Sequence, residues 1–243
     1  MGKLKSTMGN LLFPGKCVFC GTLLPLGADR EHAVCPVCEK KLPYCVALPR
    51  CKACGKPVEE PAVYCELCRK TPRRPYAKMS APYLYREPVK GSVIRFKRER
   101  QQGYAKVFAR HMQAVLDYDC TGKSFDVAVS VPPRKKRMNK EGYDQAACLA
   151  QELAKRMGIP YFARVLKQKE NRKKQSDLTA AERFRNARGN YLVCKPAAVR
   201  EKTVLLIDDV CTTGATLAEC ARVLREAGAA KVYCATAATA EKG

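Results

Sequence analysis

The stretch that most restricts the fold of this chain is Val204 to Thr216, which reads VLLIDDVCTTGAT. Its first four residues are apolar and predict a short buried strand. Asp208 and Asp209 follow, then a small hydroxyl-rich turn, and then helical periodicity from Leu217 to Leu224 that Gly228 would end. A strand, a loop and a helix in this order point backbone N–H groups at a phosphate. The stretch therefore predicts an α/β fold with an anion site.

The chemistry of this loop favours a sugar 5-phosphate. It has neither the lysine of a Walker A loop nor the glycine pattern of a dinucleotide-binding loop. Asp208 and Asp209 are suited instead to accept hydrogen bonds from vicinal ribose hydroxyls. The phosphate would be held by Cys211, Thr212, Thr213, Gly214, Ala215 and Thr216. Because Cys211 would lie at a helix N-terminus, we expect a favoured thiolate that is alkylated faster than Cys148 or Cys220.

This stretch resembles the phosphoribosyl pyrophosphate (PRPP) signature of the type I phosphoribosyltransferases. The resemblance implies a parallel-sheet core in which Asp208 and Asp209 hold the ribose 2- and 3-hydroxyls and the next loop holds the 5-phosphate. It also implies a Mg²⁺ ion bound together with PRPP, in agreement with the preference of this ion for oxygen ligands.

A second loop is expected to bind the pyrophosphate group. A predicted strand from Asp126 to Val131 ends at Pro132-Pro133, and a cationic run follows directly, namely Arg134, Lys135, Lys136 and Arg137. Ligands of doubly wound sheets bind at the carboxyl ends of strands, where these cations can neutralise a pyrophosphate leaving group. An exposed basic turn is the alternative. A separate basic run, Arg95, Lys97, Arg98 and Arg100, is expected to form a solvated face, with an anion site as the alternative.

Cysteine spacing predicts metal sites in the first seventy residues. Eight of the fifteen cysteines form four C-x-x-C pairs, with fourteen residues between the first two pairs and ten between the last two. In a reducing compartment this spacing predicts two zinc sites rather than disulfides. The expected ligands are Cys17, Cys20, Cys35, Cys38, Cys51, Cys54, Cys65 and Cys68. Tandem and cross-braced pairings both fit, and His32 and Cys45 are further candidate ligands.

A proline-rich, charged segment from Lys70 to Pro75 predicts a domain boundary. We expect a double zinc ribbon over residues 1–72 and a phosphoribosyltransferase-like domain over residues 73–243. This order resembles the ComF family of bacterial proteins, the ComFC- and GntX-like proteins. In that family the segment that corresponds to Gln175 to Asn186 forms a flexible hood over the sugar.

A further mark of the resemblance departs from the family pattern. The family commonly has Arg-Gly-Phe-Asn-Gln where this chain has Glu141 to Gln145. Glu141 and Asp144 therefore place two negative groups near the expected pyrophosphate loop.

The resemblance implies transfer of a phosphoribosyl group from PRPP to an unknown acceptor, with release of pyrophosphate. The alternative is a non-catalytic competence factor for DNA uptake, with single-stranded DNA or a competence helicase as its partner. The formal charge of +23, from 46 Lys plus Arg against 23 Asp plus Glu, favours polyanionic partners and is compatible with both functions. Because no apolar run approaches the ~20 residues of a membrane span, we expect a cytoplasmic protein without a membrane anchor.

Overall fold

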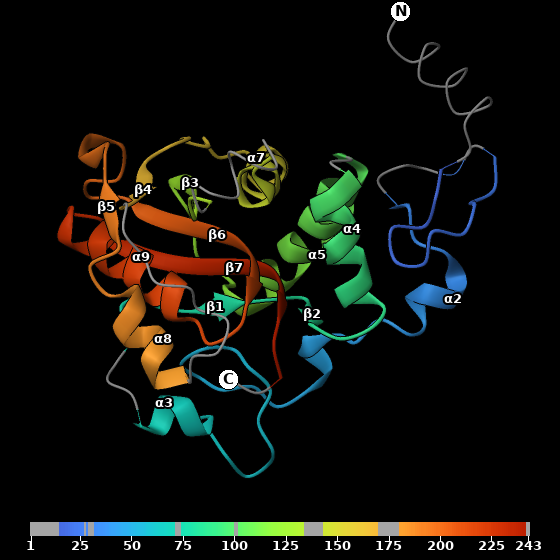
Figure 1. The fold of residues 1–243 in the computed structure, drawn as a ribbon, viewed down its shortest axis with the longest axis horizontal. Helices are drawn as coiled ribbons and strands as arrows, with labels where there is room; N and C mark the ends of the chain where they lie inside the picture. Colours follow the sequence, from blue (N-terminus) through green and yellow to red (C-terminus); the bar gives the residue numbers. More distant parts are fainter. Residues whose placement is uncertain are drawn as a thin grey trace, which may run out of the picture.

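The computed structural model describes residues 15–26, 28, 32–70, 74–99, 102–133, 143–169 and 180–241. The cations predicted to bind pyrophosphate, Arg134 to Arg137, lie outside these residues, as do Glu141 and the first part of the hood segment. The elements of Figure 1 are α2 (Pro36–Glu39), η2 (Cys45–Ala47), α3 (Glu66–Lys70), β1 (Met79–Ser80), β2 (Tyr83–Leu84), α4 (Val89–Glu99), α5 (Gln102–Asp119), β3 (Val127–Ser130), α7 (Gln145–Met157), β4 (Leu166–Gln168), α8 (Ala180–Ala187), β5 (Tyr191–Val193), η3 (Pro196–Ala198), β6 (Thr203–Cys211), α9 (Ala215–Glu226) and β7 (Lys231–Thr239).

A parallel sheet forms the core, with strand order β1-β7-β6-β3 and with β2 also pairing with β7. Leu205 and Ile207 of β6 pack in a cluster with α5 and α7, whereas Val204 and Leu206 pack in a second cluster with α9. Helices thus cover both faces of the sheet (Figure 1), which explains why residues 204–207 of β6 are all apolar rather than alternating with polar residues. The predicted α/β class with a parallel sheet is confirmed.

Strand β6 is longer than the apolar run predicts. It continues through Cys211, which pairs with Thr239 of β7, and Asp208 pairs with Thr236 in the same ladder. The acidic pair therefore lies inside the strand rather than beyond it. Strand β7 pairs with β6 as far as Thr239. The backbone of Asp208 and Asp209 is therefore fixed by the sheet rather than lying in a loop.

Helix α7 has a capping residue at each end. The Asp144 side chain caps its N-terminus by accepting a hydrogen bond from the Ala147 N–H at 2.9 Å. Gly158 ends the helix in the left-handed conformation, with φ of 67°. Asp144, which differs from the family pattern, thus has a local structural role at the start of this helix.

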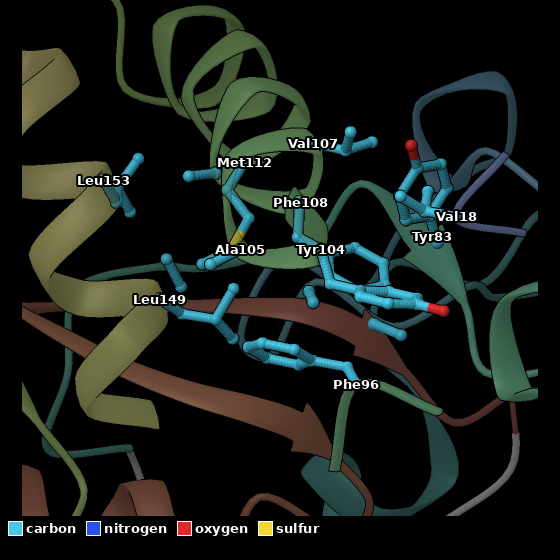
Figure 2. Close-up of a cluster of buried hydrophobic side chains, with 14 of the residues drawn as sticks. Val18, Tyr83, Phe96, Tyr104, Ala105, Val107, Phe108, Met112, Leu149 and Leu153 are labelled. Carbon is cyan, nitrogen blue, oxygen red and sulfur yellow. The ribbon is translucent and has the colours of Figure 1, made fainter. Parts of the chain in front are cut away.

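The first zinc ribbon, which carries the cysteines from Cys17 to Cys38, shares the hydrophobic core of the sheet domain. Figure 2 shows Val18 beside Tyr83, close to Phe108 of α5. The Phe19 ring lies edge-on to Tyr83 and to Phe108, with centroid distances of 5.6 and 6.0 Å. The Arg95 guanidinium of α4 donates to the carbonyls of Val18 and Phe19. The prediction of a solvated face is therefore wrong for Arg95, which fastens the ribbon to α4.

The second zinc ribbon, which carries the cysteines from Cys51 to Cys68, is attached to α5 of the sheet domain through a charged contact. Arg50 donates to both carboxylate oxygens of Asp119 at 2.8 and 2.6 Å, and Ser80 donates to the same carboxylate at 2.7 Å. The two charged side chains are 12% and 2% exposed, so removing either would leave a buried charge without its partner. Within the described residues, no helix combines the length and apolar character needed to cross a membrane.

Candidate functional site

Two cysteine tetrads form in tandem. The first joins Cys17, Cys20, Cys35 and Cys38, and the second joins Cys51, Cys54, Cys65 and Cys68, with all Sγ atoms of a tetrad within 4.8 Å of one another. Neither tetrad includes His32 or Cys45. The structure therefore decides the pairing that the sequence left open, and all fifteen cysteines are free of disulfides.

The tetrads fit structural zinc. The Sγ atoms of Cys20 and Cys35 are 3.7 Å apart, as are those of Cys54 and Cys65. Four thiolates at the usual Zn–S distance of about 2.3 Å on a tetrahedron have S–S separations of about 3.8 Å. Four cysteine ligands leave no open coordination position, so the zinc would stabilise each ribbon rather than activate a substrate.

Asp208 and Asp209 lie side by side at the end of β6. The Asp209 N–H donates to Asp208 Oδ1 at 2.8 Å, and the Val210 N–H donates to Asp209 Oδ1 at 2.7 Å. Burial raises the pKa of Asp208 well above its usual value, and the neighbouring Asp209 raises it further. The backbone bonds fix the carboxylates, and because each carboxylate oxygen can accept more than one hydrogen bond, the pair can still accept from a ligand.

The raised pKa of Asp208 has a consequence for stability. Between the unfolded-state pKa of about 3.9 and the higher folded-state value, the folded protein holds more protons than the unfolded chain. The free energy of unfolding therefore falls as the pH rises through this window. An ionised Asp208 therefore costs stability, as is common for groups retained for binding rather than for folding.

Lys97 provides the counter-charge of the acidic pair. Its Nζ lies 2.7 Å from Asp209 Oδ2, and the two side chains are 26% and 16% exposed. The Lys97 charge also lowers the pKa of Asp208, in opposition to burial. The prediction of a solvated basic face is wrong for Lys97, because α4 carries this residue over the end of β6. Arg98 of the same run is exposed, as predicted.

The predicted phosphate loop is the short turn between β6 and α9. Gly214 is the N-cap of α9 and has φ of 79°, a conformation that a residue with a side chain rarely adopts. Thr213 is buried, and its Oγ1 accepts from the Ala215 N–H at 3.3 Å, whereas Thr212 is exposed. The first N–H groups of a helix lack intrahelical partners, so this turn and the start of α9 can donate to an anion.

Cys211 differs from the prediction. It is the last residue of β6, is 3% exposed, and lies beneath the turn rather than at its surface. Burial raises its pKa to about 11. The expected thiolate is wrong, because the low-dielectric surroundings of the sheet outweigh the favourable field of the helix N-terminus.

A pocket of about 350 Å³ adjoins this region. It is lined by Pro132 and Pro133 after β3 and by Arg164, Lys167 and Gln168 around β4. Because Val131 donates its N–H to the Ile207 carbonyl at 2.9 Å, the two prolines lie next to the acidic end of β6. The predicted ribose and 5-phosphate residues thus lie at the carboxyl end of the sheet, where doubly wound folds bind ligands. The pocket lies at the end of the neighbouring strand β3, and none of these predicted residues lines it.

Sequence reasoning missed two side chains of this region. They are Lys97, which pairs with Asp209, and Tyr76, whose hydroxyl lies 3.6 Å from the position of a Cβ at Gly214. Lys97 belongs to a basic run that the sequence did show, but its partner is more than a hundred residues away. Tyr76 is equally distant from Gly214 along the chain, so no local pattern predicts that they approach one another.

Comparison with known proteins covers both parts of the chain. Residues 139–243 match the phosphoribosyl transferase domain, and residues 8–69 match the double zinc ribbon domain. The DNA utilization protein YhgH of Salmonella typhimurium is 30% identical over 225 residues, which cover 91% of this chain and 96% of that protein. Competence protein F of Haemophilus influenzae is 29% identical over 90% of this chain and 95% of its own. The competence protein ComFC of Bacillus subtilis is 28% identical over 204 residues, which cover 82% of this chain and 81% of that protein.

Proposed function

Because this chain belongs to the ComF family of competence and DNA-utilization proteins, we propose that it binds PRPP and transfers the phosphoribosyl group to an acceptor. The observation that carries the proposal is the fixed acidic pair, Asp208 and Asp209, directly before a phosphate-binding turn at the carboxyl end of a parallel sheet. The phosphoribosyl transferase domain match over residues 139–243 supports it.

In the proposed complex, Asp208 and Asp209 accept hydrogen bonds from the ribose hydroxyls, and Thr212 to Thr216 donate to the 5-phosphate. Arg134 to Arg137 would neutralise the pyrophosphate. The acceptor nucleophile forms a bond to C1 of the ribose while the C1–O bond breaks. The electron pair of the C1–O bond leaves with pyrophosphate. A Mg²⁺ ion bound with PRPP near Asp208 and Asp209 would neutralise part of the negative charge of the ligand.

The pocket beside Pro132 and Pro133 is the proposed entrance of the acceptor. Its lining is mainly apolar, with Arg164 and Lys167 on the wall, so it suits an acceptor that has an apolar body and a polar or anionic end. We further propose that the protein works in the cytoplasm, where reducing conditions keep the eight cysteine ligands available for zinc.

Calorimetric titration of Mg²⁺-PRPP into the zinc-loaded protein tests the proposal. The native protein is expected to bind, and the double variant Asp208→Asn/Asp209→Asn is expected to bind at least about 100-fold more weakly, because two charge-assisted hydrogen-bond acceptors are lost. Without ligand, the single variant Asp208→Asn should be at least as stable as the native protein, since the neutral amide removes the cost of a buried charge. Absence of PRPP binding by the native protein would contradict the proposal.

The relatives named for competence and DNA utilization, together with the charge of +23, favour binding of single-stranded DNA as a second function. Fluorescence anisotropy with a labelled oligonucleotide at several salt concentrations is expected to give a slope of log K against log salt of about −3 or steeper, as for four or more phosphate contacts. The Asp208→Asn/Asp209→Asn variant should keep this binding. A flat salt dependence would contradict the second function.

A further inference from the structure

Arg74 lies between the second cysteine tetrad and helix α8. Its Nη2 donates a hydrogen bond to the Sγ atom of Cys68, a tetrad member on α3, at 3.4 Å. The same guanidinium lies over the ring of Phe184 on α8, with its central carbon 4.5 Å from the ring centroid. Figure 1 shows α8 between α3 and α9. Arg74, which belongs to the predicted boundary segment from Lys70 to Pro75, thus connects the ribbon to a helix more than a hundred residues later in the chain.

The tetrad provides the counter-charge of Arg74 when zinc is bound. One Zn²⁺ ion and four thiolates together carry a net charge of about −2, and the guanidinium offsets part of it. Among the described residues, the Nε and Nη1 atoms of Arg74 are buried and have no hydrogen-bond partner. A buried cation of this kind is costly without a negative group beside it. Because the ribbon depends on zinc for its fold, loss of the metal would also release Arg74.

Helix α8 depends on its neighbours for stability. It has 8 residues, fewer than the ~12 that an isolated helix needs in water. Toward α9, the N–H of Gly189 just after the helix donates to the buried carboxylate of Glu219 at 2.7 Å. Toward α3, Phe184 contacts Arg74, and a cation–π contact is stronger where water is excluded. Loss of Arg74 would therefore remove one of these two supports of α8.

We propose that Arg74 couples zinc in the second tetrad to the stability of α8. The Cys68 thiolate of the zinc-loaded tetrad holds the guanidinium, and the guanidinium holds Phe184. Arg74 is a positioning residue and not a catalytic one. Because α8 belongs to the segment expected to form the hood over the sugar, the second ribbon would also stabilise part of this hood. Only this last step rests on the proposed function.

Linkage makes the coupling reciprocal. If zinc stabilises α8 through Arg74, a ligand that stabilises α8 must also strengthen zinc binding by the second tetrad. Mg²⁺-PRPP is therefore expected to slow the release of the second zinc ion to a chelator. Release from the first tetrad should not change, because Arg74 donates to a member of the second one.

The first test compares Arg74→Met with Arg69→Met in the zinc-loaded full chain. Arg69 is exposed on α3 beside Cys68, so its variant removes the same charge without removing the contact. Zinc release to a chelator is followed with a metal-sensitive dye, and the phase of the second zinc ion is identified by its absence in Cys54→Ser. Arg74→Met is expected to release this ion about 10- to 100-fold faster, the usual loss of metal affinity when a partner of a ligand is removed. Arg69→Met should change neither phase, and Arg74→Lys should restore part of the retention.

Hydrogen exchange of the α8 amides, followed by mass spectrometry, measures the coupling itself. With Arg74 present, Cys54→Ser removes the second zinc ion and is expected to raise this exchange about 10-fold or more, the effect of losing a desolvated cation–π contact. In Arg74→Met the exchange should already be raised, and adding Cys54→Ser should raise it no further. Helix α7 packs on the other face of the sheet and should be unchanged, which controls for general unfolding.

Phe184→Leu tests the same coupling from the side of the helix, with the tetrad left intact. It is expected to speed release of the second zinc ion, because the ring no longer holds the guanidinium. The double variant Arg74→Met/Phe184→Leu should release this ion no faster than Arg74→Met alone, as for two residues that act through one contact. Fully additive effects of the two substitutions would overturn the proposal.

Other results would also overturn the coupling. They are equal acceleration of both zinc phases in Arg74→Met, and an α8 exchange that responds to loss of the second zinc ion equally with and without Arg74. If the native protein binds no PRPP, the proposed function fails, and the coupling is still decided by zinc release and exchange. If PRPP binds without slowing release of the second zinc ion, only the link between α8 and the sugar site is overturned.

Discussion

Replacing Cys54 with serine is expected to release one of the two zinc ions and to destabilise the second ribbon by on the order of 10 kcal/mol, the scale of structural zinc binding. The reason is that the Sγ atoms of its tetrad lie within 4.8 Å of one another, and three thiolates cannot complete the tetrahedral site. Metal analysis by atomic emission and thermal unfolding would measure the two effects.

Cys45→Ala is the matched control for this prediction. Cys45 is fully buried but belongs to neither tetrad, so its variant should keep both zinc ions and lose only packing. Two zinc ions in Cys54→Ser, or one in Cys45→Ala, would contradict the tandem assignment of the ligands.

Replacing Phe19 with alanine is expected to lower the free energy of unfolding by about 3–5 kcal/mol, the usual range for a buried phenylalanine. Phe19 is 2% exposed and packs edge-on against Tyr83 and Phe108 of the sheet domain. Both zinc ions should remain bound, because the tetrads are intact. Denaturant unfolding, followed by circular dichroism and by a zinc-release dye, would measure the loss.

Leu23→Ala in the same ribbon is the control. Its side chain is 61% exposed, and surface substitutions of this kind usually change stability by less than about 0.5 kcal/mol. An equally small effect of Phe19→Ala would show that the first ribbon does not contribute to the shared core. We propose that the two parts of the chain, divided near residue 72, unfold as one unit for this reason.

Much of the candidate site could be predicted from local sequence. The eight zinc ligands stand in four C-x-x-C pairs, and each knuckle brings its own two thiolates together whatever the rest of the fold does. Asp208, Asp209 and the Thr212-to-Thr216 turn follow one apolar run, so their order along the chain already implies a strand, an anion loop and a helix. Helix α7 was equally local, since Asp144 and Gly158 mark its two ends.

The amino-acid sequence by itself thus determined the metal ligands, the strand-loop-helix unit and the α/β class, because these depend on neighbours along the chain. Only the tertiary structure decided the tandem pairing of the cysteines, the burial of Cys211, and the partners of Arg95 and Lys97. These features depend on which distant segments of the chain meet at the sheet. Burial at the sheet shifts the pKa of a charged group or a thiol, and the sequence alone does not show which groups are buried.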